Sequence, residues 1–303
     1  MKTRLLAALL GLALPALAQR QQLVVLGVAQ DAGYPQIGAV QEFAAVELGQ
    51  RTRQKVVALG VVDEQTQQKF LFEATPDLPA QLFALNEWLP TPGTLPTGIF
   101  LTHGHLGHYT GLLYLGREAA GASAVPVYAM PRMAEFLTKN APWSQLVALH
   151  NVQLRPLAAG QEIVLNPQLK VRPFLVPHRD EFTETVGFEI AGQHKKVVFI
   201  PDIDKWSKWP QSLPAVIKAA DYVLLDATFY RNGEIARDMA EVPHPFVEET
   251  LKLLAALGPA ERAKVYFIHF NHTNPLLAPD SPERREVLRQ GFHVAEEGLE
   301  LAL

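Results

Sequence analysis

The sequence predicts an α/β protein in which two β-sheets lie face to face between outer layers of helices, a four-layer αββα sandwich. Short apolar runs rich in Val, Leu and Phe alternate with segments of helical pattern, which places helices outside sheets. These elements form two similar series along the chain, and two series predict two sheets. No linker rich in Pro, Gly or Ser separates them, so we expect residues 19–303 to form one domain.

The first half of the chain begins with apolar runs that have the composition of strands. We expect these strands at residues 23–28, 44–48, 56–62, 70–73 and 98–101. A helix should begin at residues 75–77, where Pro76 suits a first helical turn. Further helices are expected at residues 109–118, 131–139 and 142–149, the last two forming an insertion.

The second half repeats this alternation. We expect strands at residues 152–156, 170–176, 185–190, 196–200, 222–225 and 265–270. Helices are expected at residues 213–220, 246–257 and 282–290. Residues 293–301 are expected to close the sheet as a last strand.

Residues 1–18 have the features of a cleaved secretory signal peptide. Lys2 and Arg4 precede an apolar stretch at residues 5–14, which is too short for a stable membrane span. Small residues before Gln19 supply a cleavage pattern, so we expect cleavage after Ala18 and a periplasmic or secreted protein. An uncleaved anchor is the alternative.

Composition narrows the classes of function. The chain has 303 residues and no cysteine, so an exported form has no disulfides and depends on an ordinary core. Its hydrophobic fraction of 48% is that of a soluble globular protein, and no second apolar span follows the signal. A formal net charge of -4 argues against nucleic acid as the partner and favours a small-molecule substrate. The oligomeric state is left open.

The most informative segment is LTHGHLGH at residues 101–108. It places His103, His105 and His108 directly after an apolar strand. Imidazole nitrogens that converge at a strand end suit zinc, and iron or manganese less exclusively. A chance cluster on a solvated loop is the alternative, and later residues weigh against it.

Four later polar residues each end an apolar run. They are His178, Asp202, Asp226 and His269. Each one alone is equally well explained as the cap of a turn. Together with the histidine loop, they predict a metal site at one edge of the sheets, because strand ends that repeatedly present His or Asp are what such a site requires.

At this point the chain resembles the metallo-β-lactamase superfamily, whose signature is a His-x-His-x-Asp-His loop followed by single His, Asp and His ligands at strand ends. The resemblance implies the metallo-β-lactamase fold with mixed sheets. It also implies a metal held by His103, His105 and His178. His108 and His269 would help to hold a second metal, and Asp202 would bridge the two.

Within the superfamily the chain most resembles the pyrroloquinoline-quinone biosynthesis B proteins. The supporting segments are residues 25–27, 34–36, 226–229 and the long IHFNHTNP segment at residues 268–275. The DATF segment at residues 226–229, followed by His244, also resembles the branch that contains transfer-RNA 3′-processing enzymes and cyclic-phosphate phosphodiesterases. In that branch a histidine after such a segment assists at the scissile phosphate.

Two positions depart from these patterns. Gly107 stands where the superfamily loop has aspartate, so the second metal site loses a ligand. We therefore expect either one tightly bound zinc or a weaker, asymmetric second ion, with Asp180, Glu181 or His272 as replacements that nothing in the sequence selects. The cysteine-rich segment of the quinone-biosynthesis proteins is also absent, because residues 37–42 contain no cysteine.

These residues predict a metal-dependent hydrolase. A metal held by three histidines keeps a position for water, whose pKa falls to about 7, so that metal-bound hydroxide is the expected nucleophile. Asp202 would orient the water, and His244 would donate a proton to the leaving group unless it is an ordinary residue at a helix start. A phosphodiester or cyclic phosphate is slightly preferred as substrate over an ester, lactone or amide.

Two alternatives stay open. Iron-dependent oxidation of a tyrosine- or quinone-like substrate follows from the resemblance to the quinone-biosynthesis proteins. A non-catalytic binding protein with a degraded second metal site follows from Gly107. Among minor positions, Asp204, Trp206 and Trp209 would form an aromatic pocket wall or pack on the surface. Asp31 would lie in a loop at the rim of the site or in a plain turn.

Overall fold

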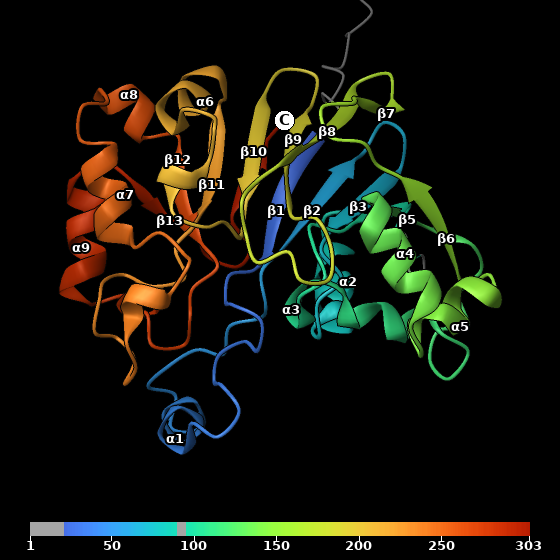
Figure 1. The fold of residues 1–303 in the computed structure, drawn as a ribbon, viewed down its shortest axis with the longest axis horizontal. Helices are drawn as coiled ribbons and strands as arrows, with labels where there is room; N and C mark the ends of the chain where they lie inside the picture. The colour runs from blue at the N-terminus through green and yellow to red at the C-terminus, as the bar shows by residue number, and fades with distance from the viewer. Residues whose placement is uncertain (1–20, 90–94) are drawn as a thin grey trace, which may run out of the picture.

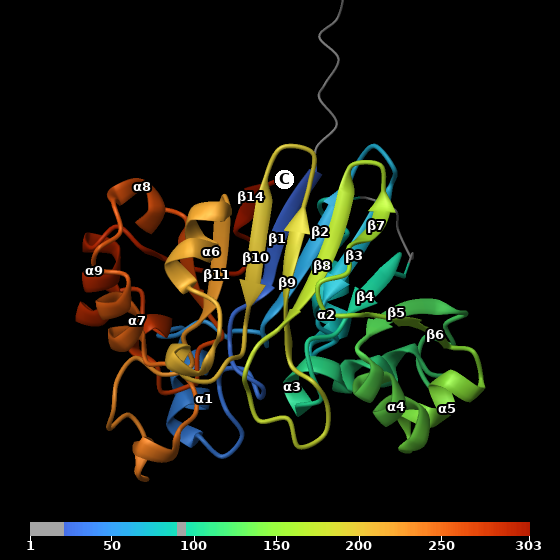
Figure 2. The ribbon, with the colours of Figure 1, turned by 45° about the horizontal axis from the view of Figure 1, so that its top comes forward.

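Two β-sheets pack face to face, and helices cover their outer faces (Figure 1). The computed structural model describes residues 21–89 and 95–303, so the expected signal peptide at residues 1–18 lies outside the described residues. Both sheets are mixed, and Figure 2 shows strands of the second sheet running over those of the first. The sandwich that the sequence predicted is therefore confirmed.

The first sheet has the strand order β14-β1-β2-β3-β4-β5-β6. Its strands are β1 (Gln21–Gly27), β2 (Ala58–Asp63), β3 (Gln68–Phe72), β4 (Gly98–Phe100), β5 (Val125–Ala129), β6 (Val152–Pro156) and β14 (Glu300–Ala302). Neighbours from β14 to β3 are antiparallel, and neighbours from β3 to β6 are parallel. The parallel part contains β4, whose end begins the histidine loop.

The second sheet has the order β13-β12-β11-β10-β9-β8-β7. Its strands are β7 (Ile163–Asn166), β8 (Leu169–Leu175), β9 (Val186–Ala191), β10 (Lys196–Ile200), β11 (Tyr222–Asp226), β12 (Val265–Ile268) and β13 (His293–Val294). Strands β10 to β13 run parallel to one another. Their carboxyl ends therefore open at the same edge of the sheet.

Helices α2, α4 and α5 pack on the outer face of the first sheet, and α6, α7 and α9 pack on the second. The helices are α1 (Val40–Glu47), α2 (Leu78–Leu85), α3 (Leu106–Tyr109), α4 (Pro131–Lys139), α5 (Trp143–Ala148), α6 (Leu213–Ala219), α7 (Val247–Leu253), α8 (Pro259–Arg262) and α9 (Pro282–Arg289). Short 3-10 turns occur at η1 (Thr110–Leu115), η2 (Trp206–Lys208), η3 (Met239–Glu241) and η4 (Pro275–Leu277). Among the residues described, no helix combines the length and hydropathy that crossing a bilayer requires.

Aromatic rings lock the two sheets together directly beneath the histidine loop. Phe72 and Phe100 of the first sheet stack at 4.8 Å, and both meet Phe188 of the second sheet edge-on, at 5.4 and 5.7 Å between ring centroids. All three side chains are fully buried. Truncating a buried phenylalanine to alanine costs roughly 3–5 kcal/mol, so this contact holds the strand ends in a fixed relation.

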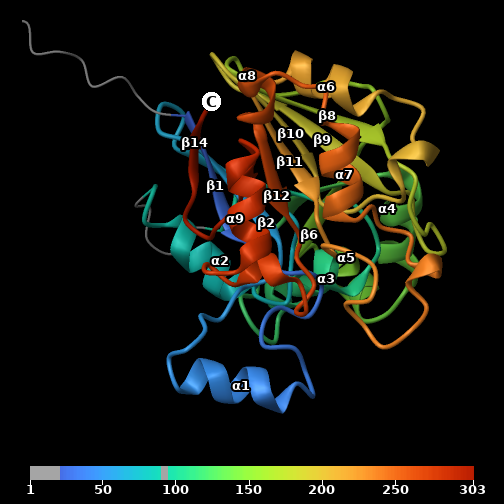
Figure 3. The same cartoon turned by 90° about the vertical axis from the view of Figure 1, so that its left-hand side faces the viewer.

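Residues 44–48, which the sequence predicted as a strand, lie instead at the end of helix α1. The run contains Ala44, Ala45 and Glu47, which favour a helix, and it lacks the alternation of a half-buried strand. No residue of α1 is buried, and the helix projects from the body of the molecule (Figure 3). The prediction was wrong because a short apolar run was read without regard to its helix-forming residues.

Three other expectations need correction. Residues 109–118 form the end of α3 and the 3-10 turn η1 rather than one α-helix, and strands β5 and β7 were not expected. Residues 293–301 do not form one strand. Strand β13 joins the second sheet and β14 joins the first. The chain crosses from one sheet to the other between them: the Ala295 amide still donates to Phe267 of the second sheet, and the Gly298 amide already donates to Val25 of the first.

Candidate metal centre

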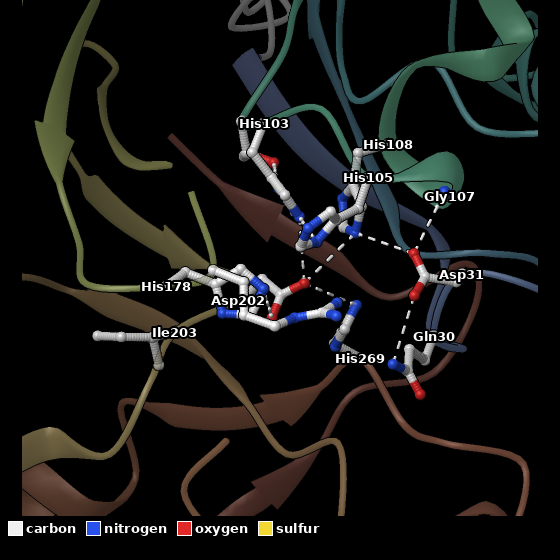
Figure 4. Close-up of polar contacts among 12 residues, drawn as sticks. Gln30, Asp31, His103, His105, Gly107, His108, His178, Asp202, Ile203 and His269 are labelled. Carbon is white, nitrogen blue, oxygen red and sulfur yellow. Dashed lines mark hydrogen bonds and ion pairs between the residues drawn. The ribbon is translucent and has the colours of Figure 1, made fainter. Parts of the chain in front are cut away.

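Polar side chains from the ends of both sheets converge at one point. His103 follows β4, Asp202 follows β10 and His269 follows β12, so the packed strands fix the backbone of each residue. His178 follows β8 in the same way. Figure 4 shows five histidines arranged around Asp202: His103, His105, His108, His178 and His269. The structure therefore brings together all the metal ligands that the sequence and the resemblance nominated.

A first cluster contains His103, His105, His178 and Asp202, whose ligand atoms all lie within 4.8 Å of one another. Asp202 Oδ2 lies 3.4 Å from His103 Nε2, and Asp202 Oδ1 lies 3.3 Å from His178 Nε2. His103 Nε2 lies 2.8 Å from His105 Nδ1. Ligand atoms on a tetrahedral zinc, each roughly 2.1 Å from the ion, are separated by about 3.4 Å. The spacing of Asp202 from the two histidines matches that geometry.

A second cluster shares Asp202 with the first. It contains His108, Asp202 and His269. Asp202 Oδ2 lies 3.6 Å from His108 Nε2 and 3.7 Å from His269 Nε2. One carboxylate therefore lies between two groups of imidazoles, which is the position of a bridging ligand.

Unpaired buried atoms show that the site fits a divalent cation. His108 Nε2, His178 Nε2, His269 Nε2 and Asp202 Oδ1 are buried and have no hydrogen-bond partner. Leaving such atoms unpaired costs about 1–3 kcal/mol each, so native proteins rarely do so. Imidazole nitrogen and carboxylate oxygen are ligands of zinc. A bound ion would satisfy all four atoms at once.

Buried Glu73 supports the histidine loop from below. Its carboxylate Oε1 accepts a hydrogen bond from the Thr102 hydroxyl and lies 3.2 Å from His108 Nδ1. Thr102 Oγ1 also lies 2.9 Å from His103 Nδ1. Contacts of this kind orient metal-ligating imidazoles and raise their basicity. Glu73 was not among the residues predicted from the sequence, although it follows an apolar strand as the nominated ligands do.

Asp204 and Thr228 support two further ligands. Asp204 Oδ1 lies 3.4 Å from His178 Nδ1, and Thr228 Oγ1 lies 2.9 Å from His269 Nδ1. Burial alone would raise the pKa of Asp204, but its contacts with His178 and Lys208 outweigh burial and lower that pKa to about 2. Asp204 is therefore a carboxylate that orients His178 rather than part of an aromatic wall.

Two site residues occupy a strained backbone conformation. His269 has a φ of +67° and Glu73 a φ of +84°, the left-handed region that residues other than glycine rarely adopt. Each such residue costs about 1–3 kcal/mol and persists only where its surroundings hold it. Backbone hydrogen bonds from Glu73 to Phe100 and from Phe270 to Val28, each 2.8 Å, supply that restraint.

The protonation states favour metal binding. Burial lowers the pKa of His103 well below its usual value, and His108 lowers it further. Burial also lowers the pKa of His269, against the opposing effect of Asp226. The pKa of His105 falls to about 4, chiefly through burial. These imidazoles are neutral at pH 7, which is the form that coordinates a metal.

His108 behaves differently in the metal-free site. Burial disfavours its charged form, but the carboxylate of Glu73 outweighs burial and raises the pKa of His108 to about 9. Metal binding would displace this proton, because a coordinating imidazole nitrogen must be free of it. The metal affinity of the second cluster should therefore rise with pH up to that value.

His244 forms a pair with Asp226 beside the two clusters. His244 Nδ1 donates to Asp226 Oδ2 at 2.8 Å and lies 3.2 Å from Asp202 Oδ1. Burial favours the neutral imidazole, but Asp226 and Asp202 outweigh it and raise the pKa of His244 to about 9. Asp226 is fixed in turn by the backbone amides of Ile203 and Thr228, at 3.0 and 2.8 Å. In the metal-free protein, His244 therefore carries a proton at pH 7 beside the candidate metal ligands.

A cavity of about 490 Å³ reaches His244 from the surface. Its wall also contains two cationic side chains, Arg179 and Arg237, and the amides of Gln30 and Asn271. Asp238 and Glu241 line it as well. The cavity is large enough for a small-molecule ligand and combines donors with a protonated histidine.

The three residues considered as replacements for the missing aspartate lie elsewhere. His272 Nδ1 pairs with Glu42 Oε1 at 2.6 Å, and Asp180 Oδ2 lies 3.6 Å from Arg132. Glu181 Oε1 lies 3.5 Å from His105 Nε2, beside the first cluster rather than the second. Trp206 does not line the site either, since its indole donates to Thr250 Oγ1 at 2.9 Å.

Known proteins resemble this chain in sequence and in fold. A family model described as the beta-lactamase superfamily domain matches residues 68–270. The coenzyme PQQ synthesis protein B of Xanthomonas euvesicatoria pv. vesicatoria is 28% identical, over 93% of this chain and 100% of that protein.

Two solved structures have the same fold. Zn(2+)-bound PqqB from Methylobacterium extorquens matches with a TM-score of 0.75 and 24% identity, covering 93% of this chain and 100% of that one. A diphosphatase from the PhnP family matches with a TM-score of 0.65 and 22% identity, covering 94% and 97%. The likeness extends over nearly the whole chain.

Proposed function

The chain belongs to the metallo-β-lactamase superfamily, and on this premise we propose that it is a metal-dependent hydrolase with a phosphodiester or cyclic phosphate as its preferred substrate. One observation carries the proposal: protonated His244 lies between the metal ligand Asp202 and a cavity that also contains Arg179 and Arg237. An ester, lactone or amide is neutral at the reacting group when it binds, so three cations favour its binding less than that of a phosphodiester, which is already an anion.

The residues of the site divide the chemistry among them. A zinc ion held by His103, His105 and His178 would lower the pKa of a water molecule and polarise an oxygen of the substrate. Asp202 would accept a hydrogen bond from the attacking water and so orient it. Because Nδ1 of His244 is bonded to Asp226, its Nε2–H is the proton available to the leaving oxygen.

The cavity supplies recognition of the phosphoryl group. Arg179 is half-exposed at its rim, and Arg237 comes from the segment before η3. Guanidinium groups hold phosphate oxygens through paired, charge-assisted hydrogen bonds. The acidic Asp238 and Glu241 in the same wall favour a substrate whose charge is confined to one phosphoryl group.

A substrate panel tests this proposal. The metal-loaded protein and a His244→Ala variant should be assayed on bis(p-nitrophenyl) phosphate, a 2′,3′-cyclic nucleotide, an aryl ester, a lactone and a β-lactam. We expect turnover of the phosphodiesters, with kcat about 100-fold lower in the variant because a general acid contributes 10²–10⁴-fold. A metal-loaded protein that turns over only the lactone or β-lactam, or none of the panel, contradicts the proposal.

One observation favours a second candidate function. His108, His269 and Asp202 form a donor set of two histidines and one carboxylate, which is the set that non-haem ferrous iron uses in oxygenases. Iron-dependent oxidation of a tyrosine- or quinone-like substrate, which the sequence resemblance left open, would use such a donor set. Iron in the purified protein, with oxygen consumption on adding such a substrate, would favour this function over hydrolysis.

A further inference from the structure

The second metal cluster lacks a fourth ligand from the histidine loop, because residue 107 is glycine. We propose that Asp31, on the turn after β1, supplies this ligand in place of residue 107 and completes a two-metal centre. The inference rests on the metal centre of the proposed function and extends it. It concerns metal stoichiometry and not the reaction.

The carboxylate of Asp31 lies in the place of the missing side chain. Its Oδ1 lies 3.5 Å from His108 Nε2, which is the spacing of two ligands on one tetrahedral ion. The same oxygen accepts a hydrogen bond from the Gly107 amide at 3.2 Å. Figure 4 shows this carboxylate between Gly107 and His108, on the side of His108 that faces away from His103.

Gly107 is required by the position of Asp31. A Cβ atom at residue 107 would lie 2.4 Å from the Asp31 Cα and 2.6 Å from its Oδ1, so the two side chains exclude each other. A side chain at residue 107 and the carboxylate of Asp31 therefore cannot occupy this place together, and in this chain Asp31 occupies it. The absence of the loop aspartate is therefore no sign of a degraded site.

The turn that carries Asp31 is joined to the strand end that carries His269. Gln30 N donates to Phe270 O at 2.8 Å, and Phe270 N donates to Val28 O at the same distance. Gln30 Nε2 lies 3.4 Å from Asp31 Oδ2, and Asn271 donates to Gln30 Oε1 at 2.7 Å. Asp31 and His269 therefore approach the second cluster on segments that pair with each other.

An unsatisfied atom marks where the ion would lie. His108 Nε2 is fully buried and has no hydrogen-bond partner, although Asp31 and Asp202 flank it at 3.5 and 3.6 Å. Each carboxylate is too far from His108 Nε2 for a hydrogen bond and lies at the separation from it that two ligands of one ion have. The compact group of His108, Asp202 and His269 does not include Asp31, so Asp31 would close on the ion from outside that group. The side chain of Asp31 is 26% exposed, so the fourth ligand lies on the solvent side of the cluster.

Metal content tests the assignment without an activity assay. Chelator-treated protein should be dialysed against buffered zinc, and its zinc content should be measured by inductively coupled plasma mass spectrometry. We expect about two equivalents in the wild type, about one in Asp31→Asn and Asp31→Ala, and two in Asp180→Asn, whose carboxylate pairs with Arg132 outside the cluster. Two equivalents in the Asp31 variants, or one in the wild type, would overturn the proposal.

Cysteine substitution gives a direct spectroscopic readout. The chain contains no cysteine, so Asp31→Cys introduces a single thiol. With cobalt in place of zinc, we expect a thiolate-to-cobalt charge-transfer band in Asp31→Cys and none in Asp180→Cys. Cobalt bound at full stoichiometry without that band in Asp31→Cys contradicts the assignment. A two-metal protein that hydrolyses no substrate would instead refute only the proposed function.

Discussion

His244 and Asp226 form a buried hydrogen-bonded pair, with Nδ1 and Oδ2 2.8 Å apart. Asp226 is fully buried and His244 almost so, and the pair lies directly beside Asp202. In the metal-free protein the arrangement keeps an imidazolium next to the cluster that contains the neutral imidazoles of His103 and His105. His244 thus lies close to the candidate metal ligands but is held by a different carboxylate, Asp226.

The charge on this pair predicts a pH-dependent stability in the metal-free protein. The pKa of His244 is raised from 6.5 to about 9, because Asp226 and Asp202 outweigh burial. Because the pKa of His244 is higher in the folded protein than in the unfolded chain, its protonation stabilises the folded state. This stabilisation is fully present below pH 6.5 and is lost as the pH rises to about 9. Asp226→Asn should therefore lower the free energy of unfolding most below pH 6.5, and the difference from wild type should narrow towards pH 9.

Urea denaturation of chelator-treated protein across this range measures the effect. Asparagine has only one acceptor oxygen, so the variant also loses the hydrogen bond from the amide of Ile203 or of Thr228, and this part of the difference does not vary with pH. If the free energies of unfolding of wild type and Asp226→Asn differ by the same amount from acid to alkaline pH, then Asp226 does not raise the pKa of His244.

Glu73 should control metal affinity without touching the metal. Glu73→Gln replaces the anionic partner of His108 and Thr102 by a neutral one of the same size. Removing a residue that orients a metal-binding histidine typically lowers the metal affinity about 10–100-fold. We therefore expect zinc to bind the second cluster of Glu73→Gln about 10–100-fold more weakly than that of the wild type. Competition with a chromophoric chelator measures this. Glu135→Gln on exposed α4 is the matched control and should bind zinc as the wild type does.

Arg237 and Arg179 should govern recognition of the phosphoryl group rather than turnover. Replacing either one by alanine removes a cation from the cavity wall, and we expect KM for a phosphodiester to rise about tenfold with kcat nearly unchanged. Arg117→Ala, exposed and paired with Glu118, should leave both constants unchanged. A fall in kcat without a change in KM would place these arginines in the reaction instead.

We propose that the protein is exported and loses residues 1–18. Expression of the full chain in a Gram-negative host should yield a periplasmic protein whose intact mass begins at Gln19. Replacing Lys2 and Arg4 by glutamate should retain the precursor in the cytoplasm. A full-length cytoplasmic protein from the unaltered chain would contradict export.

The strand-end pattern located the site because parallel strands share one edge. An apolar run followed by His or Asp marks where each strand of β4, β10, β11 and β12 ends, and the carboxyl ends of these strands meet. Glu73 obeys the same rule at the end of β3 and escaped notice because it was assigned to the strand itself. The sequence contained that signal.

Asp31 and Asp204 had no comparable local signal. Asp31 reaches His108 only because its turn pairs with the backbone of Phe270, a contact between segments far apart in the chain. Asp204 reaches His178 because two strand ends of the second sheet meet there. Pairings of this range depend on sheet order, which periodicity does not specify. The error at residues 44–48 has a different origin, since no residue of helix α1 is buried and burial therefore gives no pattern to read there.

The most direct test of the metal centre is elemental analysis of the protein purified without chelator or added metal, beside His103→Ala. His103 lies in the first cluster, so we predict about two equivalents of zinc in the wild type and the loss of at least one in the variant. Iron in the wild type would favour oxidation over hydrolysis. No metal in either protein would contradict the account, because the buried, unpaired nitrogens of the site would then lack the partner that their geometry requires.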